Sequence, residues 1–216
     1  MPDAHGSDNP GAQRARLRAL RRGLGARERE LAERAILREL LRLRLAGPGR
    51  RIGAYVAVRG EASVARFIAT ALSRGSSVYL PKIALARAGT MHLLPIAGPR
   101  DLASGAYGIP SPSSPIARRV RPRELDVVLV PLLGFDSRGH RLGMGAGFYD
   151  RWLRRRRDPR AWRRPLLIGV GFAIQELPAI EPHAWDVRLD AIVTERGVAR
   201  PVHYREPAIQ AKGGSR

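Results

Sequence analysis

Residues 125–151 read LDVVLVPLLGFDSRGHRLGMGAGFYDR and contain a strand, a turn and a glycine-rich segment in close succession. The run Leu125–Val130 is apolar on both faces, as is typical of a central strand in a parallel sheet. Pro131 closes the run, residues 136–139 form a polar turn, and residues 148–156 are expected to form a helix. This order predicts an α/β fold whose ligands bind beyond the carboxyl ends of the strands.

Three alternating glycines, Gly143, Gly145 and Gly147, form a glycine ladder after the turn. Without a Cβ atom, their backbone can approach a ligand closely and turn N–H groups towards it. Such N–H groups bind anions at a helix start, Arg141 adds a fork for phosphate oxygens, and Asp150 adds an oxygen ligand suited to Mg²⁺. These residues indicate a nucleotide-phosphate site, although an ordinary glycine-rich hairpin has the same bare pattern.

The rest of the chain alternates between helical and strand patterns. Helical periodicity runs from residue 13 to residue 45, with a joint at Gly23–Gly25. The other expected elements are strands at 51–58, 76–80 (closed by Pro81), 92–94, 166–172 and 191–194, a helix at 65–74 and a loop at 98–114. The alternation predicts a three-layer α/β/α sandwich with a central, mostly parallel sheet in a single domain, residues 13–200. Residues 1–12 are expected to be a disordered tail, and residues 201–216 a loosely ordered one.

Composition narrows the class of protein. The chain has 216 residues, of which 44% are hydrophobic, and it has no cysteine, so neither disulfides nor thiolate metal sites are expected. The N-terminus has no apolar signal segment and no run reaches membrane length, so we expect a cytoplasmic protein without a membrane partner. The net charge is +20, almost all from arginine. It would attract ATP or nucleic acid, and charge alone does not choose between them.

A basic helix face is expected near the N-terminus, because Arg14, Arg18, Arg21 and Arg22 lie three and four residues apart. It could be a solvated stripe, a nucleic-acid surface or a phosphate site. Asp150 and Asp186 look like a metal pair, but each could equally be a cap or turn residue. The five histidines lack metal-ligand spacing, and no nucleophile elbow is present, so histidine metal sites and serine hydrolysis are not expected.

The glycine-rich segment resembles the signature of the 5-formyltetrahydrofolate cyclo-ligase family, P-x-L-x-F-D-x-x-G-x-R-L-G-x-G-x-G-[YF]-Y-D-R. The matching residues are Pro131, Leu133, Phe135, Asp136, Gly139, Arg141, Leu142, Gly143, Gly145, Gly147, Phe148, Tyr149, Asp150 and Arg151. Three further blocks follow the family's order: the basic N-terminal helix, Ile52–Glu61 and Gly169–Glu195. Together the blocks cover most of residues 14–198.

The resemblance implies a set of site residues. ATP would contact Arg14, Arg18, Arg141, Gly143, Gly145, Ala146, Gly147, Phe148 and Tyr149. The folate substrate would contact Val56, Glu61, Met144, Gly145, Ala146, Gly147 and Phe148. Asp150 and Asp186 would bind Mg²⁺ with Asp190 as a supporting residue, and Arg141, Tyr149 and Asp150 would act in catalysis. Arg14 replaces a lysine of the family pattern, Met144 and Ala146 stand at variable positions, and Ser111 replaces a common acidic residue, which puts a folate contact in that loop in doubt.

The implied activity is the ATP- and Mg²⁺-dependent cyclisation of 5-formyltetrahydrofolate, with or without a polyglutamate tail, to 5,10-methenyltetrahydrofolate. It would proceed through a phosphorylated formyl group, an imidate phosphate, and release ADP and phosphate. We expect a monomer. The alternatives are a basic RNA-binding protein that uses the arginine face, which would leave the ladder and both aspartates unexplained, and a different activity on a related scaffold, such as sugar-phosphate isomerisation.

Overall fold

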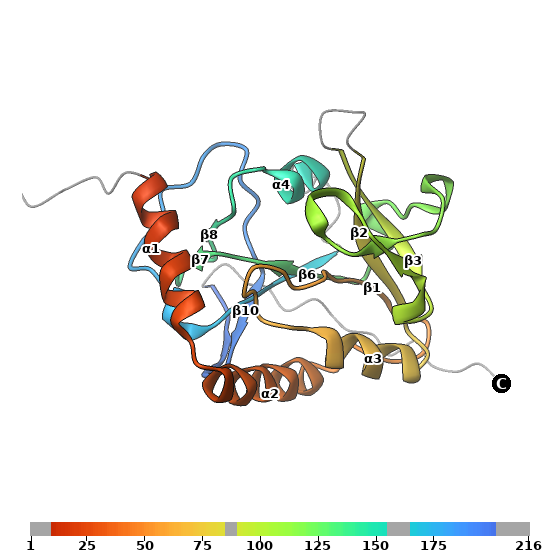
Figure 1. The fold of residues 1–216 in the computed structure, drawn as a ribbon, viewed down its shortest axis with the longest axis horizontal. Coiled ribbons are helices and arrows are strands. Elements are labelled where there is room, and N and C mark those ends of the chain that lie inside the picture. Colours follow the sequence, from red (N-terminus) through yellow and green to blue (C-terminus); the bar gives the residue numbers. More distant parts are fainter. Residues whose placement is uncertain (1–9, 85–89, 155–164, 202–216) are drawn as a thin grey trace, which may run out of the picture.

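The computed structural model describes residues 10–84, 90–154 and 165–201, and Figure 1 shows their arrangement. The helices are α1 (Pro10–Gly23), α2 (Ala26–Arg42), α3 (Ala65–Ser73) and α4 (Phe148–Trp152). The main sheet contains β1 (Arg51–Gly53), β2 (Ser77–Ala84), β3 (Thr90–Ile96), β6 (Val127–Pro131), β9 (Leu166–Val170), β10 (Ala191–Thr194) and β11 (Gly197–Ala199). Two small hairpins pair β4 (Leu102–Ala103) with β5 (Ser111–Pro112), and β7 (Gly134–Phe135) with β8 (Arg141–Leu142).

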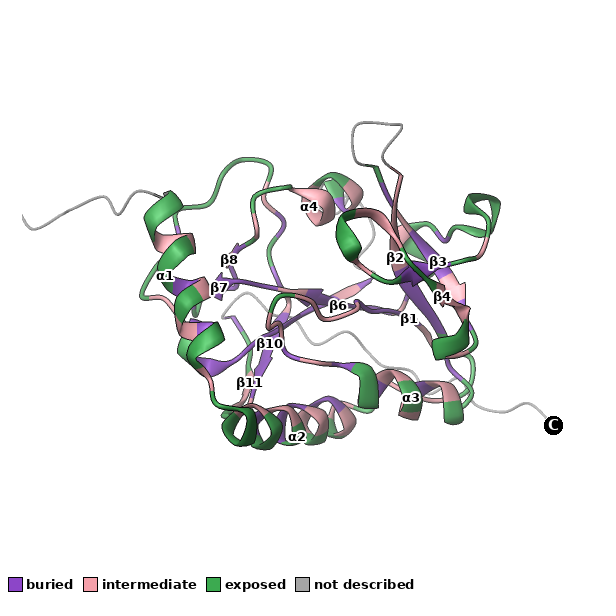
Figure 2. Cartoon of the chain, in the orientation of Figure 1, coloured by how far each residue is buried: buried purple, intermediate pink, exposed green. Residues whose placement is uncertain are grey.

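The main sheet has the order β11-β10-β9-β6-β1-β2-β3. Neighbouring strands are parallel except at the two edges, where β11 and β3 run antiparallel to β10 and β2. The expectation of a mostly parallel sheet is therefore confirmed. β6 is the fourth of the seven strands, as its two apolar faces predicted, and Val127–Val130 are all buried (Figure 2).

The side chains of β6 alternate between two hydrophobic cores. Val127 and Leu129 pack with buried residues of α2 and α3, whereas Val128 and Val130 pack on the opposite face, beneath α4 and Leu153. Figure 1 shows α2 and α3 together on one side of the sheet and α4 on the other. The chain is thus a three-layer α/β/α sandwich, as expected. No helix within the described ranges is long and apolar enough to span a membrane.

Several element boundaries differ from the sequence-based expectation. The strand predicted at 51–58 ends at Gly53, because the chain then folds back: the Tyr55 hydroxyl donates to the Ala62 carbonyl at 2.6 Å. The strand predicted to stop at Pro81 continues to Ala84. Proline has no N–H to donate to a neighbouring strand. Because the pairing of β2 with β1 ends at Tyr79, Pro81 costs no hydrogen bond to β1.

The ends of the chain and the long loop also differ. Helix α1 begins at Pro10, three residues earlier than expected, and the joint at Gly23–Gly25 is confirmed. The helix predicted to reach residue 156 ends at Trp152; residues 155–164, most of the N-terminal tail and residues 202–216 lie outside the described part. Strand β11 was not expected, and the predicted loop 98–114 contains the β4–β5 hairpin.

Candidate active site

The glycine ladder lies between β8 and α4, beyond the carboxyl end of the central strand β6. Gly145 and Gly147 have φ values of 102° and 62°, a left-handed region that other residues rarely adopt. A Cβ atom at Gly143 or Gly145 would meet nothing within 4 Å, so the backbone is open to a ligand here. Helix α4 has only five residues, so the anion site must depend on the ladder's own N–H groups more than on a helix dipole.

Helix α1 packs directly against this segment. Leu17 belongs to a buried cluster with Leu133, which precedes β7, with Leu142 of β8 and with Ile180. On the same helix, the Arg14 Nε donates to the Gly143 carbonyl at 3.2 Å. The half-buried Arg18 makes no hydrogen bond or ion pair with other residues of the described part. The structure therefore brings the predicted basic helix to the ladder, although that helix is far away in the sequence.

Arg141 and Asp150 form an ion pair that ties the two ends of the ladder together. The Arg141 guanidinium donates to an Asp150 carboxylate oxygen and to the Val187 carbonyl. The same Asp150 oxygen accepts the Val187 N–H at 3.3 Å. One donor on each Nη of Arg141 is thus engaged by a protein partner, and its charge lies beside the ladder.

The fold brings the backbone next to Asp186 into contact with Asp150, the other predicted metal ligand. Asp150 bonds to Val187, the residue after Asp186, while the Asp186 carboxylate accepts the His183 N–H at 2.9 Å. Among the described residues there is no group of three or more His, Cys, Asp or Glu side chains that could hold a metal alone. One or two carboxylates fit Mg²⁺ that arrives with phosphate oxygens and water. Asp190 lies at the other end of the sheet, where it accepts the Leu167 N–H at 2.7 Å, so it does not support this site.

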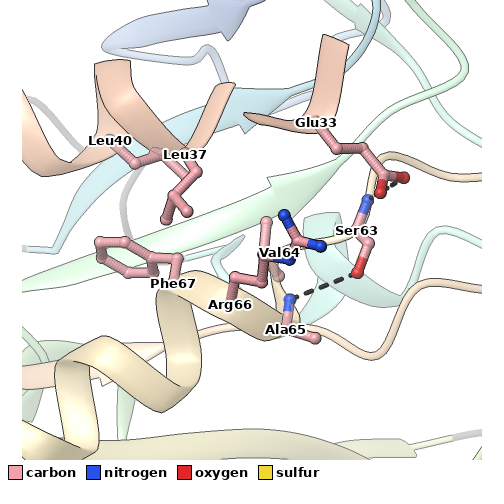
Figure 3. Close-up of a pocket in the computed structure, with 8 residues that line it drawn as sticks. All are labelled: Glu33, Leu37, Leu40, Ser63, Val64, Ala65, Arg66 and Phe67. Carbon is pink, nitrogen blue, oxygen red and sulfur yellow. Dashed lines mark hydrogen bonds between the residues drawn. The ribbon is translucent and has the colours of Figure 1, made fainter. Parts of the chain in front are cut away.

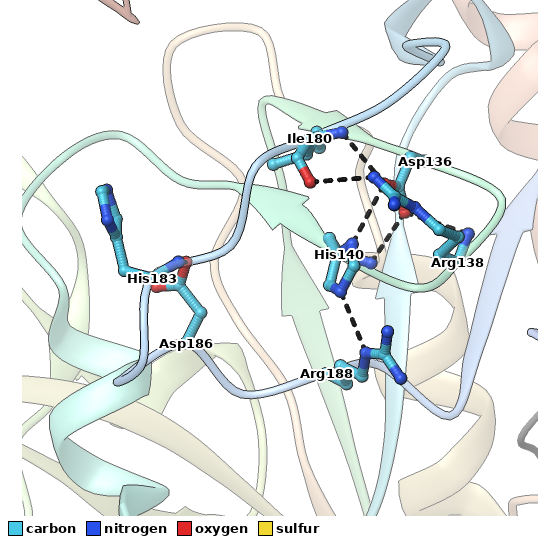
Figure 4. A network of polar contacts seen from close by, with 7 residues as sticks. All are labelled: Asp136, Arg138, His140, Ile180, His183, Asp186 and Arg188. Atoms are coloured by element: carbon cyan, nitrogen blue, oxygen red, sulfur yellow. Dashed lines mark hydrogen bonds and ion pairs between the residues drawn. The ribbon is translucent and has the colours of Figure 1, made fainter.

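A buried carboxylate, Asp136, positions the surrounding loops (Figure 4). It is completely buried and accepts hydrogen bonds from the backbone N–H groups of Arg138, His140 and Ile180. The His140 Nε2 accepts from Arg188 at 2.9 Å, which leaves its Nδ1 proton for Asp136 at 3.1 Å. Burial would raise the pKa of Asp136, but these hydrogen bonds lower it below its ordinary value. The network joins the hairpin that carries Arg141 to the loop that carries Asp186; sequence reasoning took Asp136 only for a turn residue.

A second set of polar interactions lies at the turn formed by residues 58–61. The Glu61 N–H closes this turn on the Val58 carbonyl, and the Glu61 Oε2 accepts the Val58 N–H at 3.1 Å. Burial raises the pKa of Glu61, opposed by that hydrogen bond and by the charge of Arg21. Burial also raises the pKa of Tyr149, and the Glu61 carboxylate adds to the effect while Arg141 opposes it. The charges of Glu61 in the turn and of Arg141 beside the ladder therefore both influence Tyr149.

The basic face predicted on α1 is corrected by the position of Arg21. Arg22 is exposed, but Arg21 is only 1% exposed and donates to the Arg59 carbonyl at 2.9 Å. Arg21 is buried against the 58–61 turn, where its partner Arg59 lies 38 residues away in the sequence. The spacing of residues along helix α1 gives no indication of that contact. The continuous arginine surface that a nucleic-acid interface would need is therefore interrupted.

The other predicted contacts are spread around the ladder. Phe148 is half-buried, with the Arg151 guanidinium 5.3 Å from its ring centre. Met144 packs against the α1 cluster, and Val56 packs against the core beside the turn. Ala146 is exposed, and its carbonyl accepts from Arg151 at 2.7 Å.

A separate pocket lies between α2 and α3, on the face of the sheet away from α4 (Figure 3). Its lining residues are Glu33, Leu37, Leu40, Ser63, Val64, Ala65, Arg66 and Phe67. Glu33 and Ser63 already accept the N–H groups that begin α3, at 3.0 and 3.4 Å. None of the residues predicted for the site lies in this pocket, so the ladder remains the better candidate.

Comparisons with known proteins identify the family of this chain. The sequence profile of the 5-formyltetrahydrofolate cyclo-ligase family matches residues 7–195. The 5-formyltetrahydrofolate cyclo-ligase of Haemophilus influenzae is 29% identical over 178 residues, which cover 82% of this chain and 92% of the relative. That of Mycolicibacterium smegmatis is 35% identical over 158 residues, covering 69% and 76%. The NMR structure of Aquifex aeolicus 5,10-methenyltetrahydrofolate synthetase is 26% identical and has a TM-score of 0.74, covering 95% of this chain and 99% of that one.

Proposed function

The chain belongs to the 5-formyltetrahydrofolate cyclo-ligase family, and on that premise we propose that it uses MgATP to cyclise 5-formyltetrahydrofolate at the glycine ladder. The family membership itself carries the enzyme class, a ligase of folate metabolism that forms a methenyl ring. The observation that best supports the location is the convergence of Arg14, the ladder and the Arg141–Asp150 pair beyond β6. Helix α1, the segment 141–150 and the loop of Val187 are far apart in the sequence and meet there around open backbone.

The phosphates of ATP would lie over the ladder. The N–H groups of Gly143, Gly145 and Gly147 would donate to phosphate oxygens, with Arg14 and Arg18 adding positive charge from α1. Mg²⁺ bound with the nucleotide would be held by Asp150 and Asp186 and would neutralise charge on the transferred phosphoryl group. The second oxygen of Asp150 makes no hydrogen bond within the described residues, which suits this role.

The folate would approach from the 58–61 turn. Val56 would provide an apolar wall, and Glu61 would accept hydrogen bonds from the pterin N–H and amino groups. Tyr149 follows the ladder directly and its hydroxyl is buried without a partner among the described residues, so it would donate near the transferred phosphoryl group. The excess positive charge of the chain would also favour a polyglutamate tail.

In the reaction we propose, the formyl oxygen attacks the γ-phosphorus of ATP and ADP departs. The resulting imidate phosphate has a better leaving group at the formyl carbon. The substrate's own N10 then attacks that carbon, loses its proton, and the former formyl oxygen leaves as part of phosphate. Because both reacting nitrogens belong to one substrate, the protein contributes mainly positioning and charge stabilisation.

The proposal is tested by mixing purified protein with 5-formyltetrahydrofolate and MgATP and following the absorbance of the methenyl product. We expect the signal to grow only when both ATP and Mg²⁺ are present, and ADP to appear in equal amount. A folded protein that forms product without ATP, or forms none at all, would refute the proposal.

A further inference from the structure

The Arg21 guanidinium is buried with only part of its hydrogen-bonding capacity used. Its Nη2 donates to the Arg59 carbonyl at 2.9 Å, while Nε and Nη1 are shielded from solvent and have no partner. Buried polar groups nearly always find a hydrogen bond, because leaving one unmade costs its full desolvation. A guanidinium can only donate, so the group that completes Arg21 must be an acceptor.

Arg29 offers a direct comparison, because it holds the same turn without stranded Nη atoms. Its Nη1 donates to the Gly60 carbonyl at 2.8 Å and its Nη2 donates to the Arg21 carbonyl at 2.7 Å. Its guanidinium also lies 5.1 Å from the centre of the Phe172 ring. An arginine can therefore hold this turn with both of its Nη atoms hydrogen-bonded. The unpaired Nε and Nη1 of Arg21 need another explanation.

The surroundings of Arg21 are those proposed for the folate. Arg21 donates to the Arg59 carbonyl within the turn that the Glu61 N–H closes, so both side chains belong to the same turn. The charge of Glu61 opposes the lowering of the Arg21 pKa by burial. The Tyr149 hydroxyl is likewise buried without a partner. Within the described residues, the only hydrogen bond to the Glu61 carboxylate is made to Oε2, so Oε1 is unused.

We propose that Arg21 is a specificity-determining residue that recognises the 4-oxo group of the pterin, an inference that rests on the proposed function. The pyrimidine edge of a pterin presents two donors, the 2-amino group and N3–H, followed by one acceptor, the 4-oxo oxygen. Glu61 supplies acceptors for the two donors, and one of the unpaired N–H groups of Arg21, on Nε or on Nη1, supplies the donor for the 4-oxo oxygen. Because both nitrogens are shielded from solvent, this bond requires a local displacement of the groups that cover them.

The test compares 5-formyltetrahydrofolate with its 4-amino analogue, in which a donor replaces the 4-oxo acceptor and N3 loses the hydrogen that Glu61 would accept, so Arg21 and Glu61 both contribute to the preference. For wild-type protein we expect kcat/KM to favour the 4-oxo substrate by about 100-fold or more, because a site built to bond one group rejects its opposite strongly. In Arg21→Gln the preference falls by about tenfold or more from its wild-type value, mainly through loss with the natural substrate, and the part that depends on Glu61 remains. Arg29→Gln is the matched control: it weakens the same turn but keeps the wild-type preference. Arg21→Lys, which retains a charged donor, is measured in parallel and retains more of the preference than Arg21→Gln.

The outcomes separate the inference from the proposed function. If folded Arg21→Gln keeps the wild-type preference, Arg21 only supports the turn and the inference is wrong. If Arg21→Gln does not fold, an unchanged preference in Arg21→Lys together with a lowered preference in Arg29→Gln overturns it. If wild-type protein forms no methenyl product from 5-formyltetrahydrofolate and MgATP, the proposed function itself fails, whatever Arg21 does.

Discussion

Replacing Asp150 separates its structural role from its role in the reaction. The Arg141 side chain is 5% exposed and that of Asp150 is 19% exposed, so the pair lies mostly out of water. Breaking a fully buried pair costs about 3–5 kcal/mol, and the partial exposure of Asp150 reduces this to about 2–3 kcal/mol for Asp150→Ala. In a chain of this size, that loss lowers Tm by roughly 5–10 °C. Asp150→Asn keeps an acceptor for Arg141 and should cost only about 1 kcal/mol.

The two variants should differ in stability and agree in activity. Both lose the carboxylate proposed to hold Mg²⁺, so kcat should fall by about 100- to 1,000-fold in each. Thermal unfolding gives the stability, and methenyl absorbance at several Mg²⁺ concentrations gives the activity. Asp126→Asn is the matched control, because Asp126 accepts the Arg51 N–H at the opposite end of β6 and should leave turnover unchanged. Wild-type turnover and Mg²⁺ dependence in Asp150→Asn would refute the reasoning.

Three further substitutions test other parts of the site. Asp136→Asn should lower the free energy of unfolding by about 2–4 kcal/mol, because its amide group faces the buried N–H donors of His140 and Ile180. The pKa of Asp136 is lowered, so its stabilisation is lost as pH falls below the ordinary value, and denaturation curves of variant and wild type should converge in acid. Burial raises the pKa of Glu61, so its ionised form destabilises the fold as pH rises; Glu61→Gln should increase Tm at pH 7 while lowering kcat/KM about 10- to 100-fold, and a lower Tm would contradict this. Arg14→Ala should raise the KM for ATP about tenfold with little change in Tm, and an unchanged KM would exclude Arg14 from the phosphate site.

The sequence predicted those features that depend on local pattern. Leu125–Val130 is apolar on both faces, and β6 is central in the sheet because only a strand covered on both sides needs that pattern. Gly145 and Gly147 adopt positive φ values that glycine permits without strain. The joint between α1 and α2 likewise follows from glycines at Gly23–Gly25.

Contacts between distant segments were beyond the reach of such patterns. The loop of Val187 lies beside the ladder, where Val187 bonds to both members of the Arg141–Asp150 pair. Asp190, within a motif that resembles metal-binding sequences, instead bonds at the start of β9. Neither outcome follows from spacing along the chain, since each depends on which strand ends meet at which edge of the sheet.

Three residues that depart from the rules of stable packing are associated with the 58–61 turn. Arg21 belongs by spacing to an exposed basic stripe, yet it is buried with two unpaired nitrogens. Near it, Glu61 has a raised pKa and Tyr149 has a buried, unpaired hydroxyl. Each departure costs stability by itself, and proteins accept such costs mainly where a ligand compensates for them. On the proposed function, the substrate would supply the missing partners of these groups, and this would explain why the rules of stable packing fail there and hold elsewhere in the fold.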